Sequence, residues 1–218
     1  MLYSLRNVAR ALSTGAALSL LLASATPSFA ATPKDTVVLA WAIDDIISLD
    51  PGEAFEISAG EIMGNAYDNL VNLDINDTSK VTPGIAASWT VSDDALTYTF
   101  KIKPDITFAS GNPITAADVA YTFERVVKLD KSPAFILTQF GLTKDNVAEK
   151  AKAVDESTFV LTVDKAYAPS FVLNCLTANV GSIVDKALVE QHVTDGDFGN
   201  GWLKTNYAGS GAFKMMQW

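Results

Sequence analysis

Hydrophobic residues between positions 55 and 73 recur at spacings of three and four, which is the pattern of an amphipathic helix. The apolar face of this predicted helix comprises Phe55, Ala59, Ile62, Ala66, Leu70 and Leu73. Upstream, the continuous apolar run at 37–42 is typical of a short buried strand. An acidic loop broken by Pro51 and Gly52 separates the two elements, and the polar stretch 74–80 forms a turn after the helix.

The pattern then changes to strict alternation, which predicts strands with one buried face. Apolar residues alternate with polar ones from Leu96 to Ile102, so the segment 89–102 is predicted to be a β-hairpin that turns at 92–95. A second hairpin is predicted over 147–163, with its turn at 155–157. Between them, Thr115 and Asp118 have the spacing of a capping box, which predicts a helix from 116 to about 129.

The remaining pattern predicts shorter elements. Helices are expected at 134–140, at 167–176 with Pro169 in the first turn, and at 185–193. A strand is expected at 180–184, and a glycine turn at 209–211 is expected to enter another strand. There is no internal repeat, and the pattern as a whole predicts a mixed α/β fold.

The first thirty residues have the features of a secretory signal peptide. Arg6 and Arg10 precede an apolar run at 11–25, and Ser28 and Ala30 form a small-residue cleavage pattern. The alternative, a membrane-spanning helix, requires about 20 apolar residues and is not favoured by a run that contains Ser, Thr and Gly. We therefore expect export to the periplasm with cleavage after Ala30. The segment contains no cysteine, so no lipid anchor is expected.

Composition narrows the function further. The chain has 218 residues, of which 49% are hydrophobic and 19% charged, as in soluble globular proteins. The formal net charge of −9 argues against a nucleic-acid partner. His192 is the single histidine and Cys175 the single cysteine, which excludes disulfide scaffolds and zinc fingers and disfavours histidine-based catalysis. Cys175 stands among apolar residues and is expected to be a small buried hydrophobic residue.

Residues 81–125 carry a long ordered motif, VTPGIAASWTVSDDALTYTFKIKPDITFASGNPITAADVAYTFER. This motif resembles the signature of the peptide/nickel-type solute-binding proteins of ABC importers, extracellular solute-binding family 5. The matching positions are Pro83, Ala86, Ser88, Trp89, Ser92, Asp94, Tyr98, Thr99, Phe100, Pro104, Phe108, Gly111, Pro113, Thr115, Ala116, Asp118, Val119 and Arg125. The resemblance extends back to residues 48–51 and 67–70 and forward to 209–213, so it covers essentially all of the chain after the signal segment.

Four turn positions depart from the family pattern. Ala95 and Asp105 stand where the family usually has glycine, Ser110 where it has aspartate, and Ala212 where it has proline. A residue other than glycine at a turn that needs a positive φ costs roughly 1 kcal/mol, so these departures affect local geometry and stability.

The resemblance implies a two-lobed periplasmic binding protein of a type II-like architecture. This sequence would supply its first lobe, which is α/β with a mixed sheet, and an α+β subdomain inserted into that lobe. The expected divisions are a signal peptide at 1–30, the first lobe at 31–71 and 179–218, and the satellite subdomain at 72–178. Family chains are longer, so the sequence resembles an N-terminal fragment that lacks the second lobe and the C-terminal return. The expected function is capture of peptides, or of a related small solute, for an ABC permease of the inner membrane. The alternatives are a truncated fragment that binds no ligand and, from another class, a secreted hydrolase.

The resemblance also places ligand contacts in loops that face the cleft between the lobes. The candidates are Trp41, Ala42, Ile43, Asp44 and Asp45 after the first strand, and Ala54, Phe55, Glu56, Ile57 and Ser58 at the start of the first helix. Free backbone N–H groups at a helix N-terminus can hold a carboxylate. Trp41 could equally be a core aromatic residue, and Asp44 and Asp45 could be ordinary solvated carboxylates. No catalytic residue, metal or cofactor is expected, and the full-length form is expected to be a monomer.

Overall fold

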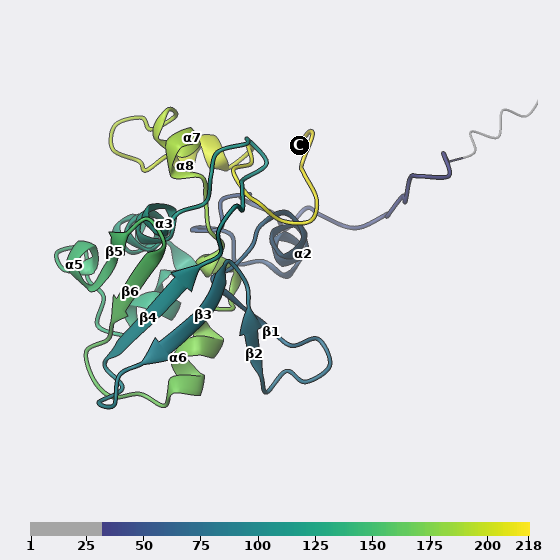
Figure 1. Cartoon of the computed structure of the whole chain (residues 1–218). Coiled ribbons are helices and arrows are strands. Elements are labelled where there is room, and N and C mark those ends of the chain that lie inside the picture. Colours follow the sequence, from purple (N-terminus) through teal and green to yellow (C-terminus); the bar gives the residue numbers. More distant parts are fainter. Residues whose placement is uncertain (1–31) are drawn as a thin grey trace, which may run out of the picture. The chain divides into compact units, whose positions relative to one another are not determined.

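The computed structural model describes residues 32–218, and its principal sheet has four antiparallel strands in the order β3-β4-β6-β5 (Figure 1). The signal segment proposed from the sequence lies outside the described residues. Strands β3 (Ala86–Val91) and β4 (Thr97–Ile102) form the first predicted hairpin, with its turn at 92–95. Strands β5 (Ala151–Asp155) and β6 (Thr158–Thr162) form the second. Both hairpin predictions are confirmed, although residues 147–150 of the second are helical.

The alternating pattern of β4 explains how this sheet acquires a buried face. Tyr98, Phe100 and Ile102 are buried, whereas Lys101 is exposed. Phe100 is paired in register with Phe159 of β6, and the ring of Phe159 lies 5.1 Å from that of Phe123 on helix α3 (Ala116–Leu129). The main hydrophobic core therefore forms between the sheet and α3.

The capping box predicted for α3 is present. The carboxylate of Asp118 accepts hydrogen bonds from the backbone N–H of Thr115 at 2.9 Å and from its hydroxyl at 2.7 Å. The other oxygen of Asp118 accepts from the backbone N–H of Lys186 at 3.1 Å. One side chain thus starts α3 and also attaches the segment that leads into helix α7 (Lys186–Glu190).

The first predicted helix is real but shorter than expected. Helix α2 spans Ile57–Ala66, and the chain becomes extended at Tyr67. Leu70 is buried beyond the helix, and Leu73 belongs to strand β1 (Val71–Leu73), which pairs with β2 (Val81–Pro83). Beyond the break the helical spacing no longer marks a buried face, because Leu70 is buried outside the helix whereas Leu73 is exposed in β1. The prediction of helix as far as residue 73 is therefore wrong.

The remaining elements are short. They are the 3₁₀ turns η1 (Ser132–Ala134) and η2 (Asn179–Gly181) and the helices α4 (Phe135–Thr138), α5 (Val147–Lys150), α6 (Pro169–Cys175), α7 and α8 (Asn200–Leu203). Helices were predicted in the regions of α4, α6 and α7, and those predictions are confirmed. The strand predicted at 180–184 is wrong, because this segment contains η2 and a single bridge between Asn69 and Ser182.

The strand predicted after the glycine turn at 209–211 is also wrong. Instead of joining a sheet, the backbone N–H of Gly211 donates to the carbonyl of Ala66, and that of Phe213 donates to the carbonyl of Asn65. These bonds satisfy carbonyl groups at the C-terminal end of α2, where no further helical turn follows.

Residues 32–41 form a separate unit and are described by themselves. They contain a turn in which the backbone N–H of Thr36 donates to the carbonyl of Pro33. The predicted strand at 37–42 is wrong: Val37 is 84% exposed, and no strand in residues 32–218 pairs with this segment. A strand needs a hydrogen-bonded neighbour, and apolar composition alone does not provide one.

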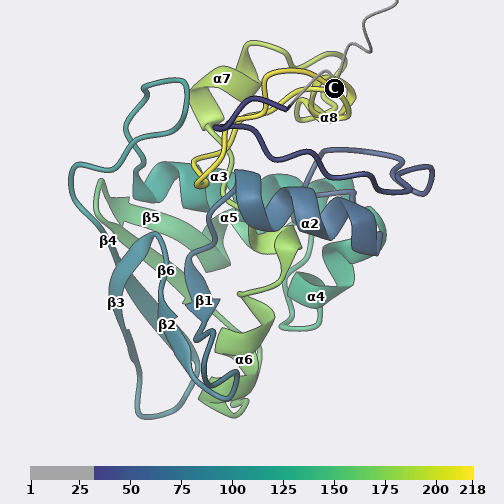
Figure 2. The same ribbon diagram turned by 90° about the vertical axis from the view of Figure 1, so that its right-hand side faces the viewer.

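Within residues 42–218, the buried side chains form two hydrophobic clusters. The larger cluster gathers residues from 70 to 183 around the sheet and α3. The smaller one comprises Leu49, Met63, Ala66, Tyr67, Tyr121, Val184, Val189, Leu203 and Ala208. Helix α2 contributes to the smaller cluster and lies beside α4 (Figure 2). The prediction of a mixed α/β fold is confirmed.

Candidate functional site

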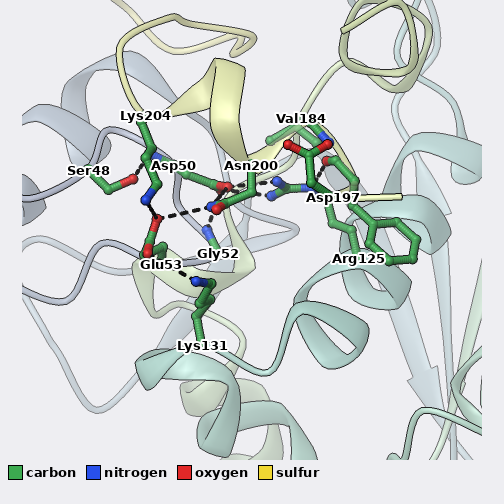
Figure 3. A network of polar contacts seen from close by, with 12 residues as sticks. Ser48, Asp50, Gly52, Glu53, Arg125, Lys131, Val184, Asp197, Asn200 and Lys204 are labelled. Atoms are coloured by element: carbon green, nitrogen blue, oxygen red, sulfur yellow. Dashed lines mark hydrogen bonds and ion pairs between the residues drawn. The ribbon is translucent and has the colours of Figure 1, made fainter. Parts of the chain in front are cut away.

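The loop that precedes α2 is anchored by Asp50, which is completely buried. The guanidinium of Arg125 donates two hydrogen bonds to the Asp50 carboxylate, at 2.8 and 2.7 Å (Figure 3). The side chain of Asn200 donates a third bond at 2.7 Å, and the backbone N–H of Gly52 a fourth at 2.8 Å. A buried ion pair is tolerated only when the remaining polar atoms are also satisfied, which is the situation here.

Glu53 continues this network toward the surface. Its side chain is 12% exposed and lies near two ammonium groups, those of Lys131 at 3.4 Å and Lys204 at 3.5 Å. Asn200 donates a hydrogen bond to the carboxylate at 3.0 Å. Burial acts to raise the pKa of Glu53, but the bond from Asn200 and the two lysines outweigh it and leave the pKa below its usual range. The loop is therefore tied to the segment before η1 and to α8.

This anchored loop forms one side of a surface pocket of about 420 Å³, which we call the α2 pocket. Its lining comes from three segments: the loop and first turn of α2, the η1–α4 region, and the stretch before and within η2. The lining residues are Ala54, Phe55, Glu56, Ile57, Gly60, Pro133, Ile136, Thr177, Ala178, Asn179 and Val180. This volume is within the range of small-molecule sites, about 300–1,000 Å³.

Phe55 lines this pocket, and Phe135 of α4 lies beside it in contact with Phe55. Phe55 is 55% exposed and Phe135 of α4 is 56% exposed, although both are large apolar side chains. Their rings make an edge-to-face contact with centroids 5.8 Å apart. Exposed aromatic residues next to a pocket are typical of surfaces that bind a partner or ligand.

The ten candidate ligand-binding residues fall into two groups in the structure. Four of them, Ala54, Phe55, Glu56 and Ile57, line the α2 pocket together. Ser58 follows them in the first turn of α2 but is not part of the lining. Trp41, Ala42, Ile43, Asp44 and Asp45 are exposed and are likewise not part of it. Their role in binding stays a prediction.

The rest of the pocket could not be identified from the sequence. Pro133 and Ile136 come from the η1–α4 region and residues 177–180 from a segment more than 40 positions further on. These residues share no spacing or motif, and only the tertiary packing of α4 and η2 beside α2 brings them to one place.

Two glycines of α2 differ in their surroundings. A Cβ atom on Gly60 would lie 3.1 Å from the side-chain nitrogen of Asn179, across the α2 pocket lining. A Cβ atom on Gly64, one turn later, would meet no atom within 4 Å. A larger side chain at position 60 would therefore occupy the pocket, whereas one at position 64 would project into open space.

The single histidine and the single cysteine of the chain are not part of the α2 pocket lining. The ring of His192 is half-buried and stacks on the ring of Trp202, with the two centroids 4.2 Å apart and the planes nearly parallel. Cys175 is half-buried against the main core, where burial raises the pKa of its thiol.

Among residues 32–218, no group of three His, Cys, Asp or Glu side chains is placed to hold a metal ion. No helix in this part of the chain is long and apolar enough to cross a membrane.

Comparison with known proteins identifies similar sequences. The sequence profile of the bacterial extracellular solute-binding proteins, family 5 Middle, matches residues 80–218. The probable D,D-dipeptide-binding periplasmic protein DdpA of Escherichia coli K12 is 33% identical over 92% of this chain. The periplasmic murein peptide-binding protein MppA of the same strain is 29% identical over 91%. The chain spans 37% and 38% of the lengths of these two relatives.

Solved structures are similar as well. Haemophilus influenzae OppA in complex with the peptide RPPGFSPFR superimposes with a TM-score of 0.67 at 26% identity, covering 78% of this chain and 34% of that chain. The Escherichia coli murein tripeptide binding protein MppA gives a TM-score of 0.63 at 30% identity, covering 76% and 33% of the two chains.

Proposed function

Because the chain belongs to the bacterial extracellular solute-binding proteins, family 5, we propose that the protein captures peptides in the periplasm and delivers them to an ABC permease. The role is binding, and no chemical step on the ligand is involved. The names of the relatives support peptides as the solute, since DdpA is described as dipeptide-binding and MppA as murein peptide-binding.

One observation carries the assignment of the ligand site. Four of the candidate ligand contacts, Ala54, Phe55, Glu56 and Ile57, line a single pocket with residues from two distant segments. Ligand capture in two-lobed binding proteins proceeds by closure about a hinge, so each lobe supplies one wall of the site. In this proposal the α2 pocket belongs to the wall of the first lobe.

The proposed division of the chain follows the same scheme. Residues 31–71 and 179–218 form the first lobe, and residues 72–178 form a satellite subdomain inserted into it. The smaller hydrophobic cluster supports this division, because it draws mainly on residues 49–67 and 184–208. The larger cluster includes residues 70, 71, 180 and 183, which lie at the edges of the two first-lobe segments. Tyr121 of α3 is the member of the smaller cluster that comes from the proposed satellite.

Export is the second part of the proposal. The basic residues, apolar run and small-residue pattern of positions 1–30 direct the chain to the periplasm, and cleavage occurs after Ala30. The intact mass of protein released by osmotic shock should correspond to a chain that starts at Ala31. Recovery of a chain that starts at Met1 from the cytoplasm would contradict export.

Calorimetric titration of the full-length protein that contains this sequence tests the binding role. Tri-alanine should bind saturably with a dissociation constant in the micromolar range, about −8 kcal/mol. Free alanine and a monosaccharide serve as controls and should bind much more weakly. Saturable binding of the monosaccharide without binding of any di- or tripeptide would reject the peptide assignment.

A further inference from the structure

Resting on the proposed function, we infer that the α2 pocket selects among peptide side chains: it admits apolar and cationic side chains and excludes carboxylates, and Glu56 makes this distinction. The pocket would then do more than receive the peptide, because it would set which sequences are bound.

Glu56 is the one ionisable side chain among the lining residues. One of its oxygens accepts a hydrogen bond from the backbone N–H of Phe55 at 3.1 Å. Among the described residues, no lysine or arginine forms an ion pair with it. Glu53, three positions earlier, has two such lysines and a bond from Asn200. The charge of Glu56 is therefore available to a ligand, whereas that of Glu53 is already compensated.

The other lining groups are apolar or neutral. Phe55, Ile57, Pro133, Ile136 and Val180 supply apolar surface, and Phe135 extends it through its edge-to-face contact with Phe55. Thr177 and Asn179 supply neutral polar groups. A ligand side chain that enters this pocket thus meets apolar walls and a single negative charge.

These surroundings discriminate by charge. An apolar side chain gains from leaving water for the walls of the pocket. A lysine or arginine side chain can bury its aliphatic stem against the same walls and bring its charge to Glu56. A ligand carboxylate would face the Glu56 carboxylate in a partly desolvated site, and juxtaposed like charges are strongly unfavourable. The free N–H groups at the start of α2 carry only about half a positive charge, so the full negative charge of Glu56 at the N-cap outweighs their attraction for a carboxylate.

The test uses tripeptides of alanine with Phe, Lys or Glu substituted at each of the three positions in turn, titrated into the full-length protein that contains this sequence. At one position, the Glu peptide should bind at least about tenfold more weakly than the Lys and Phe peptides, because only that side chain repels Glu56. In Glu56→Gln the ratio between the Lys and Glu peptides at that position should fall to within about threefold, because the repulsion is removed.

Glu61→Gln is the matched control. Glu61 lies on the same helix, is exposed, and is not part of the pocket lining, so the substitution removes the same charge without altering the site. It should leave the selectivity of the protein unchanged. Thermal melts of both variants check that the fold is retained.

The possible failures are distinguishable. If tripeptides bind but show no charge preference at any position, or if Glu56→Gln retains the preference, the selectivity inference is overturned and the peptide-binding role stands. The selectivity inference is likewise overturned if Glu61→Gln removes the preference as effectively as Glu56→Gln. If no tripeptide binds the wild-type protein, both the selectivity inference and the proposed function are rejected.

Discussion

At the scale of single residues, the departures from the family pattern have a direct structural expression. Ala95 and Asp105, which stand where related sequences usually have glycine, both adopt φ angles of 56°. This left-handed region is unfavourable for residues with a Cβ atom. Ser110, which stands where an aspartate is usual, donates its hydroxyl to the Asp185 carboxylate at 2.6 Å. The comparison with the family pattern thus correctly identified two turns, at Ala95 and Asp105, that need a positive φ.

Replacing Ala95 by glycine should therefore stabilise the protein. The expected gain is about 1 kcal/mol in the free energy of unfolding, measured by urea denaturation, because glycine adopts a positive φ without the steric penalty. Ala117→Gly is the control, since Ala117 is exposed within α3. That substitution should destabilise the protein by about 1 kcal/mol, because glycine is unfavourable inside a helix. Equal effects of the two substitutions would contradict the role of the turn geometry.

A second residue-scale prediction concerns Glu53. Its pKa in the folded protein lies below its usual value of 4.5, so the ionised form stabilises the fold. This contribution is present above the pKa of the unfolded chain and is lost as the pH falls through the folded pKa. Glu53→Gln should destabilise the protein by about 1 kcal/mol near neutral pH, with a difference from wild type that shrinks as the pH falls below 4.5, the usual pKa of the group.

Denaturation curves at several pH values measure this difference. Glu61→Gln again provides the comparison, because Glu61 is exposed and takes part in no ion pair among residues 32–218. Its effect on the free energy of unfolding should stay within about 0.5 kcal/mol at every pH. A deficit of Glu53→Gln that stayed constant down to acidic pH would show that the ionised carboxylate is not what stabilises the loop.

At the scale of elements, the sequence predicted the hairpins and α3 well because their signals are local. The alternation in β4 and the Thr115–Asp118 cap arise from residues a few positions apart, and both are present in the structure as predicted. The segment 37–42 and the segment after the glycine turn at 209–211 were predicted as strands from composition and a neighbouring turn, but a strand depends on a partner elsewhere in the chain. The same limit applies to the site, since only the contribution of residues 54–57 has a sequence signal.

The cap of α3 allows a test at this scale. Asp118 is almost fully buried and accepts three hydrogen bonds, two from Thr115 and one from the backbone N–H of Lys186. Asp118→Ala should lower the free energy of unfolding by about 2 kcal/mol, because it removes the cap and leaves partly buried donors unpaired. Urea denaturation measures the change.

Glu124→Ala is the matched acidic control on the same helix. Glu124 is partly exposed, and within residues 32–218 it pairs only with Lys128, one turn away, so its removal should change the stability by less than about 0.5 kcal/mol. If Asp118→Ala had an equally small effect, the cap would not be a principal determinant of where α3 begins.

At the scale of the whole molecule, the buried Asp50–Arg125 pair connects parts of the chain that are far apart in sequence. Arg125 belongs to α3, whereas Asp50 lies in the loop that leads to the α2 pocket, and Asn200 of α8 donates to the same carboxylate. Removing one member of such a pair leaves a buried charge without compensation, which costs about 3–5 kcal/mol. The position of the pocket loop thus depends on this buried network, which joins the loop to α3 and α8.

The central claim is that the α2 pocket forms part of the peptide site, and Gly60→Leu tests it most directly. Leucine favours the helix more than glycine does, so the fold should be retained while the side chain fills the pocket. Gly64→Leu makes the same change one turn later, where the side chain meets open space.

Calorimetry on the full-length protein that contains this sequence measures the effect. Tri-alanine binding should weaken at least about tenfold in Gly60→Leu, because a filled pocket clashes with the ligand. Gly64→Leu should bind as the wild type does. Wild-type affinity in a correctly folded Gly60→Leu variant would contradict the assignment of the site.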